Sequence, residues 1–87
     1  MDGEQTNDEA LALGALSWVL SDDGRAGRFL SLTGLTPEDL RARLGERDML
    51  AAILRFLEGH EPDLLAAADM LGVPPTVLPE ARRRLEA

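Results

Sequence analysis

The sequence predicts an all-α domain, a compact bundle of five or six short helices. No run of residues alternates apolar and polar side chains over the length of a β-strand. Glycine and proline instead separate short segments whose apolar residues recur at helical spacing. In addition, residues 16–40 align without gaps with residues 54–78, which predicts a pseudo-duplicated helix–helix–short-helix unit.

The internal repeat has an offset of 38 residues, from position 16 to position 54. Identical residues occupy four pairs of matching positions: Leu16 and Leu54, Gly34 and Gly72, Pro37 and Pro75, and Leu40 and Leu78. We therefore expect residues 10–44 to superpose on residues 48–82. We also expect a positive φ at both glycines, because each follows a helical segment and precedes an aliphatic residue.

Three helices are expected in the first half of the chain. Residues 1–6 are predicted to form a disordered acidic tail, and residues 7–87 a single helical domain. Thr6–Glu9 matches a capping box for a first helix that reaches about residue 21. Asp22–Gly24 ends that helix and caps a second one, which reaches residue 33. Thr36–Pro37 then opens a short third helix to about residue 44.

The second half of the chain repeats this pattern. A fourth helix is expected over about residues 47–58, where Gly59 ends it. Pro62 opens a fifth helix that ends at residue 71. Pro79 is predicted to start a final helix that reaches Leu85.

The first and fourth helices are the most apolar, so they should form the core. The first has apolar side chains around most of its circumference, which predicts a central helix packed on most sides. Trp18 and Phe56 occupy matching repeat positions, and we expect both to be largely buried near each other. The remaining stripe of the first helix is small or polar, and it suits either close backbone approach or plain solvent exposure: Ala10, Gly14, Ser17 and Ser21.

Composition and charge narrow the function. The net charge is −7, and four of the sixteen acidic residues lie within residues 1–9, so the rest of the chain carries −3. That balance argues against general nucleic-acid binding, which requires a positive surface. The chain has no cysteine, which removes thiol chemistry. With no signal-peptide pattern and no apolar run of bilayer length, we expect a cytoplasmic protein without a membrane partner.

Three segments of the chain resemble a known family. LGALSWV in the first helix, FLSLTGL at 29–35 and AAILRFLEGHEPDLL at 51–65 are similar to the domain-of-unknown-function 3572 family of small bacterial proteins. The similarity extends from about residue 8 to residue 85. It implies a short all-helical protein, and it implies no activity, cofactor or catalytic residue that could be carried over.

Few residues are candidates for chemistry. His60 could act with Glu61 or Asp63 as an acid–base group or partial metal site. A single histidine falls short of the three or four ligands of a zinc site, so we interpret it as a cap of the fifth helix. The serines Ser17, Ser21 and Ser31 have no histidine near them in sequence. The sequence therefore assigns no catalytic, cofactor-binding or metal-ligating residue and predicts a protein that is not an enzyme.

Two groups of arginines could attract anions. Arg25 and Arg28 follow two aspartates at the start of the second helix, and we interpret them as solvated side chains on an open face. Arg82–Arg84 lie in the last turn, where cations offset the negative end of a helix. Together with the Leu71–Val73 turn they resemble a helix-turn-helix, although Pro74, Pro75 and Pro79 crowd the start of the recognition helix.

The sequence thus favours a non-catalytic protein-interaction module. An apolar patch left uncovered on the first helix would bind a protein partner or a second copy of the chain as a homodimer. The alternative is a nucleic-acid-associated regulator that uses the helix-turn-helix-like C-terminal segment. The sequence does not identify the process, a partner or a small-molecule ligand.

Overall fold

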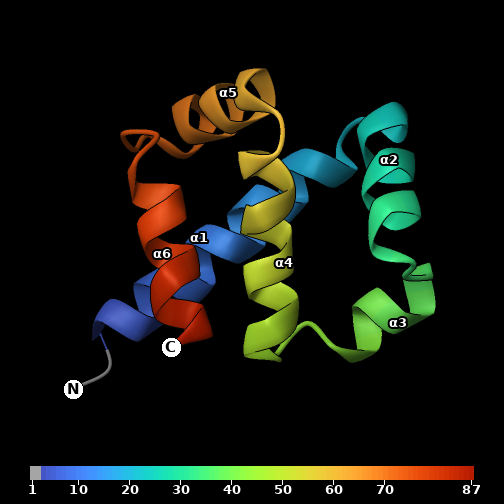
Figure 1. The fold of residues 1–87 in the computed structure, drawn as a ribbon, viewed down its shortest axis with the longest axis horizontal. Coiled ribbons are helices and arrows are strands. Elements are labelled where there is room, and N and C mark those ends of the chain that lie inside the picture. The colour runs from blue at the N-terminus through green and yellow to red at the C-terminus, as the bar shows by residue number, and fades with distance from the viewer. Residues whose placement is uncertain (1–2) are drawn as a thin grey trace.

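Six α-helices form the part of the chain that the structure describes, as Figure 1 shows. The structure is a computed structural model; it describes residues 3–87, with side chains from Asn7 onward. The helices are α1 (Gly3–Leu20), α2 (Asp23–Thr33), α3 (Pro37–Ala42), α4 (Arg47–Glu58), α5 (Glu61–Leu71) and α6 (Val77–Glu86). The radius of gyration of 11.9 Å matches the value of about 12 Å expected for a compact domain of this length. The predicted all-α class is therefore confirmed.

The ends of several helices follow from local sequence chemistry. The Asp22 carboxylate accepts a hydrogen bond of 2.9 Å from the backbone N–H of Arg25 and caps α2. Thr36 and Asp39 form a reciprocal capping box at α3, with both bonds at 3.1 Å. Gly34 and Gly72 end α2 and α5 with φ of 74° and 73°, so the predicted left-handed glycines are confirmed.

Two helix starts differ from the sequence prediction. α1 begins at Gly3, so Thr6 lies inside the helix and is not its N-cap. Thr, Asn and Asp are poor helix formers, yet α1 extends through them to Gly3. Met1, Asp2 and the side chains of residues 3–6 lie outside the described residues, and the predicted acidic tail at residues 1–6 falls on them. α6 begins at Val77, ahead of Pro79, because proline fits the first turn, where its missing N–H has no helical partner.

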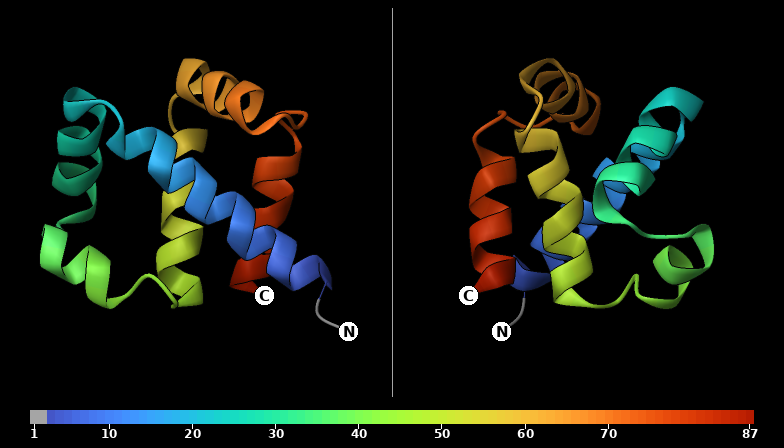
Figure 2. Two further views of the ribbon diagram at one scale, coloured as in Figure 1. Left: turned by 180° about the vertical axis from the view of Figure 1, so that it is seen from behind. Right: turned by 45° about the vertical axis from the view of Figure 1, so that its right-hand side comes forward.

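The helices pack in two layers around α4. α4 and α6 lie side by side, and α1 runs diagonally across one face of this pair (Figure 2). α5 lies across the ends of α4 and α6 and also contacts α1. α2 contacts α1, and α3 follows it at the outer edge of the molecule.

The centre of the core is α4 rather than α1. α4 contributes six buried side chains, listed in chain order as Met49, Leu50, Ala51, Ile53, Leu54 and Leu57. α1 contacts four other helices, but Leu13 and Leu20 on its outer side remain 42 % exposed. Several of its inward residues are alanines, so α1 covers the α4–α6 pair without being surrounded. The prediction of a central first helix is therefore right in that α1 contacts four other helices, and wrong in that α1 is not packed on most sides.

The small-residue stripe of α1 has both of the expected roles. A Cβ atom at Gly14 would lie 2.6 Å from Cδ2 of Leu71, so this glycine permits close packing of α5 on α1. Ala10, Ser17 and Ser21 are exposed. Only one position of the stripe therefore serves helix packing.

The aromatic residues are arranged differently from the prediction. Trp18 and Phe56 are half-buried at the edge of the core rather than at its centre. Phe56 packs edge-to-face on the fully buried Phe29, with ring centroids 5.2 Å apart. Trp18 lies instead beneath the Arg25 guanidinium, 3.7 Å from the ring centroid. The repeat register predicted equivalent positions, but the two half-chains pack against different neighbours.

The duplication is visible in element order and helix endings only. Both halves contain a long helix, an eleven-residue helix that ends at a left-handed glycine, and a third helix that opens near a proline. The third helices differ, because α6 packs along α4 and α1 whereas α3 has no comparable contact with α1. The two units therefore share local structure but not packing.

Candidate functional site

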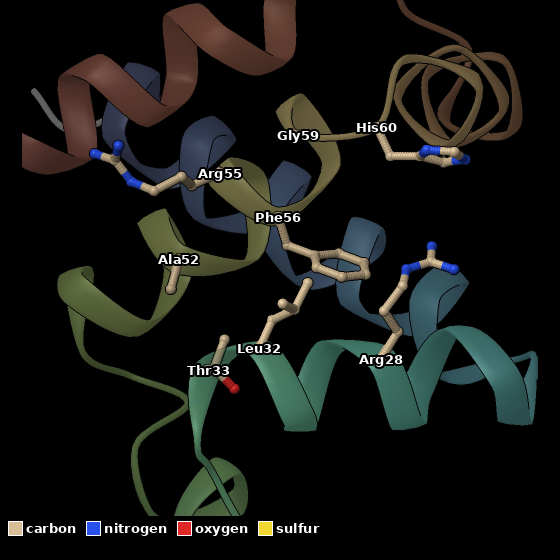
Figure 3. A pocket seen from close by; sticks show the side chains of 8 residues that line it. All are labelled: Arg28, Leu32, Thr33, Ala52, Arg55, Phe56, Gly59 and His60. Carbon is tan, nitrogen blue, oxygen red and sulfur yellow. The ribbon is translucent and has the colours of Figure 1, made fainter.

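An open groove lies between α2 and α4, and we call it the α2–α4 groove (Figure 3). Its volume is about 390 Å³. It is lined by residues of α2, of α4 and of the turn into α5: Arg28, Leu32, Thr33, Ala52, Arg55, Phe56, Gly59 and His60. The volume is within the range of small-ligand and side-chain pockets.

The Phe29–Phe56 pair explains why the groove exists. Phe29 of α2 is completely buried, and its ring meets the Phe56 ring of α4 at 81°. This edge-to-face contact is one of the favoured arrangements of two aromatic rings, and it joins α2 to α4 beside the groove. Phe56 remains half-buried and forms part of the groove wall (Figure 3).

Leu32 is the most exposed large apolar side chain in the described part of the chain, at 73 %. It projects from α2 towards Phe56 (Figure 3). The neighbouring Thr33 hydroxyl donates a hydrogen bond of 2.7 Å to the backbone carbonyl of Phe29 and is therefore turned back onto its own helix. The middle of the groove is consequently apolar.

Cationic side chains lie at the two ends of the apolar middle. Arg28 forms an ion pair with Asp63 of α5, and its guanidinium lies 5.3 Å from the Phe56 ring centroid. Arg55, at the other end, forms an ion pair with Glu86 of α6. These pairs connect α2 to α5 and α4 to α6, so the charged ends of the groove also hold the helices around it.

His60 lies beside Arg28 at the start of α5, but its side chain does not cap the helix. It occupies the N-cap position with no side-chain hydrogen bond to the helix, so our interpretation of His60 as a cap is wrong for the imidazole. Its backbone carbonyl instead accepts the N–H groups of Asp63 and Leu64 at 3.0 and 3.1 Å. The imidazole Nε2 is 4.0 Å from Asp63 Oδ1, beyond hydrogen-bonding distance. The fold thus brings His60 close to Asp63, but the Asp63 carboxylate accepts its hydrogen bond from Arg28 instead.

Arg25 is not a solvated side chain on an open face, contrary to the sequence interpretation. Its Nη2 donates to the carbonyl of Trp18 at 2.7 Å and to the Ser21 hydroxyl at 3.0 Å. Its Nε atom is buried and has no hydrogen-bond partner. The sequence placed Arg25 and Arg28 in one group, but Arg25 closes the end of α1 and Arg28 reaches the groove.

Two of the three C-terminal arginines are bound to carboxylates. Arg84 donates two hydrogen bonds of 2.8 Å to Asp8, whose side chain is 2 % exposed. Arg82 pairs with Glu58 and Glu86, and the hydrogen bond to Glu58 is the main cause of its raised pKa. Arg83 is exposed and forms no ion pair with any side chain that the structure describes. These ion pairs hold α6 on α1 and α4. The sequence had predicted only that the arginines offset the negative end of the helix.

The other candidates for chemistry remain separate. Ser21 donates to the Trp18 carbonyl at 2.6 Å, while Ser17 and Ser31 are exposed. Across the residues with described side chains, no group of three or more possible ligands is placed to hold a metal ion. Over the same part of the chain, no helix has both the length and the apolar character needed to cross a bilayer.

Sequence reasoning missed the groove because its parts come from three separate segments. The sequence analysis gave Leu32 no role, and it placed Phe56 in the core as the counterpart of Trp18 in the repeat. A signal did exist: Leu32 follows Phe29 by three positions, so both face the same side of α2. Nothing in the sequence showed that this side meets α4 at an open edge.

The fold and the groove define a small all-α protein whose surface carries an apolar groove with cationic ends. A family model described as a protein of unknown function (DUF3572) matches residues 5–87. Since this match covers nearly the whole chain, the protein belongs to the DUF3572 family, as the sequence resemblance implied. Comparison with the curated proteins and with the solved structures gives no match.

Proposed function

We propose that this protein is a non-catalytic, cytoplasmic protein-interaction module and that the α2–α4 groove is its binding surface. The observation that carries the proposal is Leu32, 73 % exposed at the edge of an apolar groove of about 390 Å³. Covering an exposed leucine removes apolar surface from water at about 25 cal/mol per Å², so a partner that fills the groove gains binding energy. Exposed apolar surface next to a concave site is typical of interaction surfaces.

The hydrogen bonds around the groove favour binding over catalysis. The Thr33 hydroxyl is bonded to the Phe29 carbonyl, and Asp63 is bonded to Arg28. A nucleophile needs a base within hydrogen-bonding reach, and Thr33 has a backbone carbonyl there instead. His60 could still transfer protons, but the groove offers it no neighbouring nucleophile among the residues that line it.

The alternative role in nucleic-acid binding has less support. It depended on Arg82–Arg84, and two of these arginines are engaged with carboxylates of the chain. Binding a phosphate would require those pairs to be broken or shared. The net charge of −7 opposes the approach of a polyanion as well.

Site-specific crosslinking tests the proposal. The photoreactive amino acid p-benzoylphenylalanine would replace Leu32 in one variant and Leu65 in a matched control. Leu65 is also exposed, at 47 %, but it lies on α5 and does not line the groove. We expect irradiation in the cytoplasm of the native host to attach a protein at position 32 that is not attached at position 65.

The captured protein must then bind the purified chain directly. We expect Leu32→Ser to weaken that binding about tenfold or more and Leu65→Ser to leave it unchanged, because only Leu32 contacts the groove. Identical products from both positions, or binding that tolerates Leu32→Ser, would show that the groove is not an interaction surface.

A further inference from the structure

The charges of the α2–α4 groove differ from those of the chain as a whole. The chain has sixteen acidic and nine basic residues, yet the lining of the groove includes two arginines and the histidine and no acidic residue. Their carboxylate partners, Asp63 and Glu86, pair with the two arginines from outside the lining, so the groove presents guanidinium N–H donors without a carboxylate of its own. A bound segment would meet these donors at close range.

The two arginines flank the apolar part of the groove instead of filling it. Figure 3 shows Arg55 at one end, Arg28 and His60 at the other, and Phe56 and Leu32 between them. An apolar side chain placed between Leu32 and Phe56 would thus have a cation on each side. The order of groups along the groove is cation, apolar surface, cation.

Both arginines retain capacity for a further partner. The ion pairs with Asp63 and Glu86 each use the Nη2 atom of the guanidinium. The side chains of Arg28 and Arg55 remain 43 % and 64 % exposed. A guanidinium has five N–H donors in a planar fork, so an incoming carboxylate can bind beside the one already present.

From this arrangement we infer that the groove binds an acidic peptide segment of a partner protein, with an apolar side chain between Leu32 and Phe56 and carboxylates on both sides of it. This inference rests on the proposed function and specifies the chemistry of the partner. The apolar side chain supplies most of the buried surface, and the carboxylates supply orientation and selectivity.

Three blocked pentapeptides provide the probes. Each has a central leucine, and the four flanking residues are all glutamate, all glutamine or all lysine. The full chain would be titrated with each peptide while NMR follows the Leu32 methyl groups, the Phe56 ring and the Nε–H groups of Arg28 and Arg55. We expect saturable shifts at these groups with the glutamate peptide, and binding about fivefold to tenfold weaker with the glutamine peptide. The lysine peptide should bind most weakly, and added salt should reduce the differences.

Matched variants assign the selectivity to the two ends of the groove. Arg28→Gln and Arg55→Gln should each reduce the preference for glutamate over glutamine. Arg83→Gln removes the same charge from an exposed position of α6 and should leave the preference intact. Leu32→Ser should weaken all three peptides alike, and it tests the apolar site without altering a charged helix contact.

The possible failures are distinct. If the peptides bind in the groove with equal affinity, the acidic partner is wrong while the groove remains an interaction surface. If no peptide shifts the Leu32 and Phe56 signals at millimolar concentration, the inference is overturned. The proposed function is then tested separately by crosslinking at position 32. If those signals shift with protein concentration alone, a second copy of the chain occupies the groove and the acidic-peptide inference is again overturned.

Discussion

Glycine positions in this chain have opposite structural roles. Gly34 ends α2 with φ of 74°, a conformation that disfavours any residue with a Cβ atom. Gly27 lies inside α2, and a Cβ atom there would meet no other atom within 4 Å. A methyl group should therefore destabilise one position and stabilise the other, within a single helix.

We predict that Gly34→Ala lowers the free energy of unfolding by about 1 kcal/mol and that Gly27→Ala raises it by about 0.5–1 kcal/mol. The first change forces alanine into a left-handed conformation, and the second replaces a poor helix former in the interior of a helix. Urea denaturation of both variants beside the parent chain measures the two signs. Equal effects at the two positions would contradict this account of the α2 ending.

The two aromatic residues Phe29 and Trp18 differ in burial. Phe29 is fully buried, whereas Trp18 is half-buried and has a guanidinium on one face. We predict that Phe29→Ala lowers the free energy of unfolding by about 3–5 kcal/mol and that Trp18→Ala costs clearly less. Denaturation followed by far-UV circular dichroism, which does not depend on the tryptophan, compares the two. A larger loss of unfolding free energy for Trp18→Ala than for Phe29→Ala would instead support the sequence prediction that Trp18 lies at the centre of the core.

At the scale of elements, α6 is held by polar contacts at its C-terminal end. Arg47 of α4 donates to the backbone carbonyls of Arg84 and Leu85 at 2.7 and 3.2 Å. These carbonyls belong to the last turn of the helix, where few backbone N–H groups remain to bond them. The Arg84 carbonyl also accepts the N–H of Ala87 at 3.3 Å, and the Arg47 guanidinium supplies the further donors. Glu86 forms ion pairs with Arg55 of α4 and with Arg82 of its own helix. The pair with Arg55 joins the end of α6 to the outer face of α4. These contacts fix α6 to α4.

The environment of Glu86 makes this contact dependent on pH. The hydrogen bond from Arg55 is the main cause that holds the pKa of the Glu86 carboxyl below its usual value of 4.5. Because the folded-state pKa is depressed, the stabilising contribution is fully present above about pH 4.5 and is lost as the pH falls through the folded value. Protonated Glu86 no longer carries the charge that both arginines bind.

We therefore predict that Glu86→Gln reduces stability at pH 7 and that the difference from the parent chain is smaller at pH 3, below the usual carboxyl pKa of 4.5. Urea midpoints measured at both pH values test this expectation. Asp69→Asn serves as the control, because Asp69 is exposed and forms no ion pair with a described side chain. A Glu86→Gln deficit that is as large at pH 3 as at pH 7 would exclude the ionic contribution.

At the scale of the whole molecule, ion pairs connect the two ends of the chain, and among the described side chains they engage five of the nine arginines. Asp8 near the start of α1 holds Arg84 near the end of α6. The pair lies against the α1–α6 contact, so it closes the bundle where the first and last helices meet. Two of the three arginines that resembled a nucleic-acid contact in the sequence, Arg82 and Arg84, are thus used within the fold.

We predict that the chain does not shift a random DNA duplex in a gel at physiological salt or at low salt. The net charge of −7 repels the phosphate backbone, and Arg82 and Arg84 are already paired. Micromolar duplex binding that Arg82→Ala and Arg83→Ala abolish would instead support the nucleic-acid role.

Local sequence chemistry was sufficient for the helices and for most of their ends. The Thr36 capping box and the glycines at 34 and 72 involve contacts within a few residues, so the pattern of side chains carries the information needed. α4 was recognisable for the same reason, because its apolar residues lie on one face. The family could also be identified from short segments of sequence, and the match over residues 5–87 confirmed it.

The helix arrangement and the groove were decided only by tertiary structure. Phe56 packs on Phe29 rather than beside Trp18, and Arg28 reaches Asp63 across 35 positions of sequence. Such contacts depend on how whole helices are placed relative to one another, and the apolar pattern of each helix is compatible with several placements. By itself the sequence determined that this is a small all-helical protein with defined helix ends. Packing decided which apolar and cationic side chains face solvent together, because that outcome depends on the space left between helices and not on any single one of them.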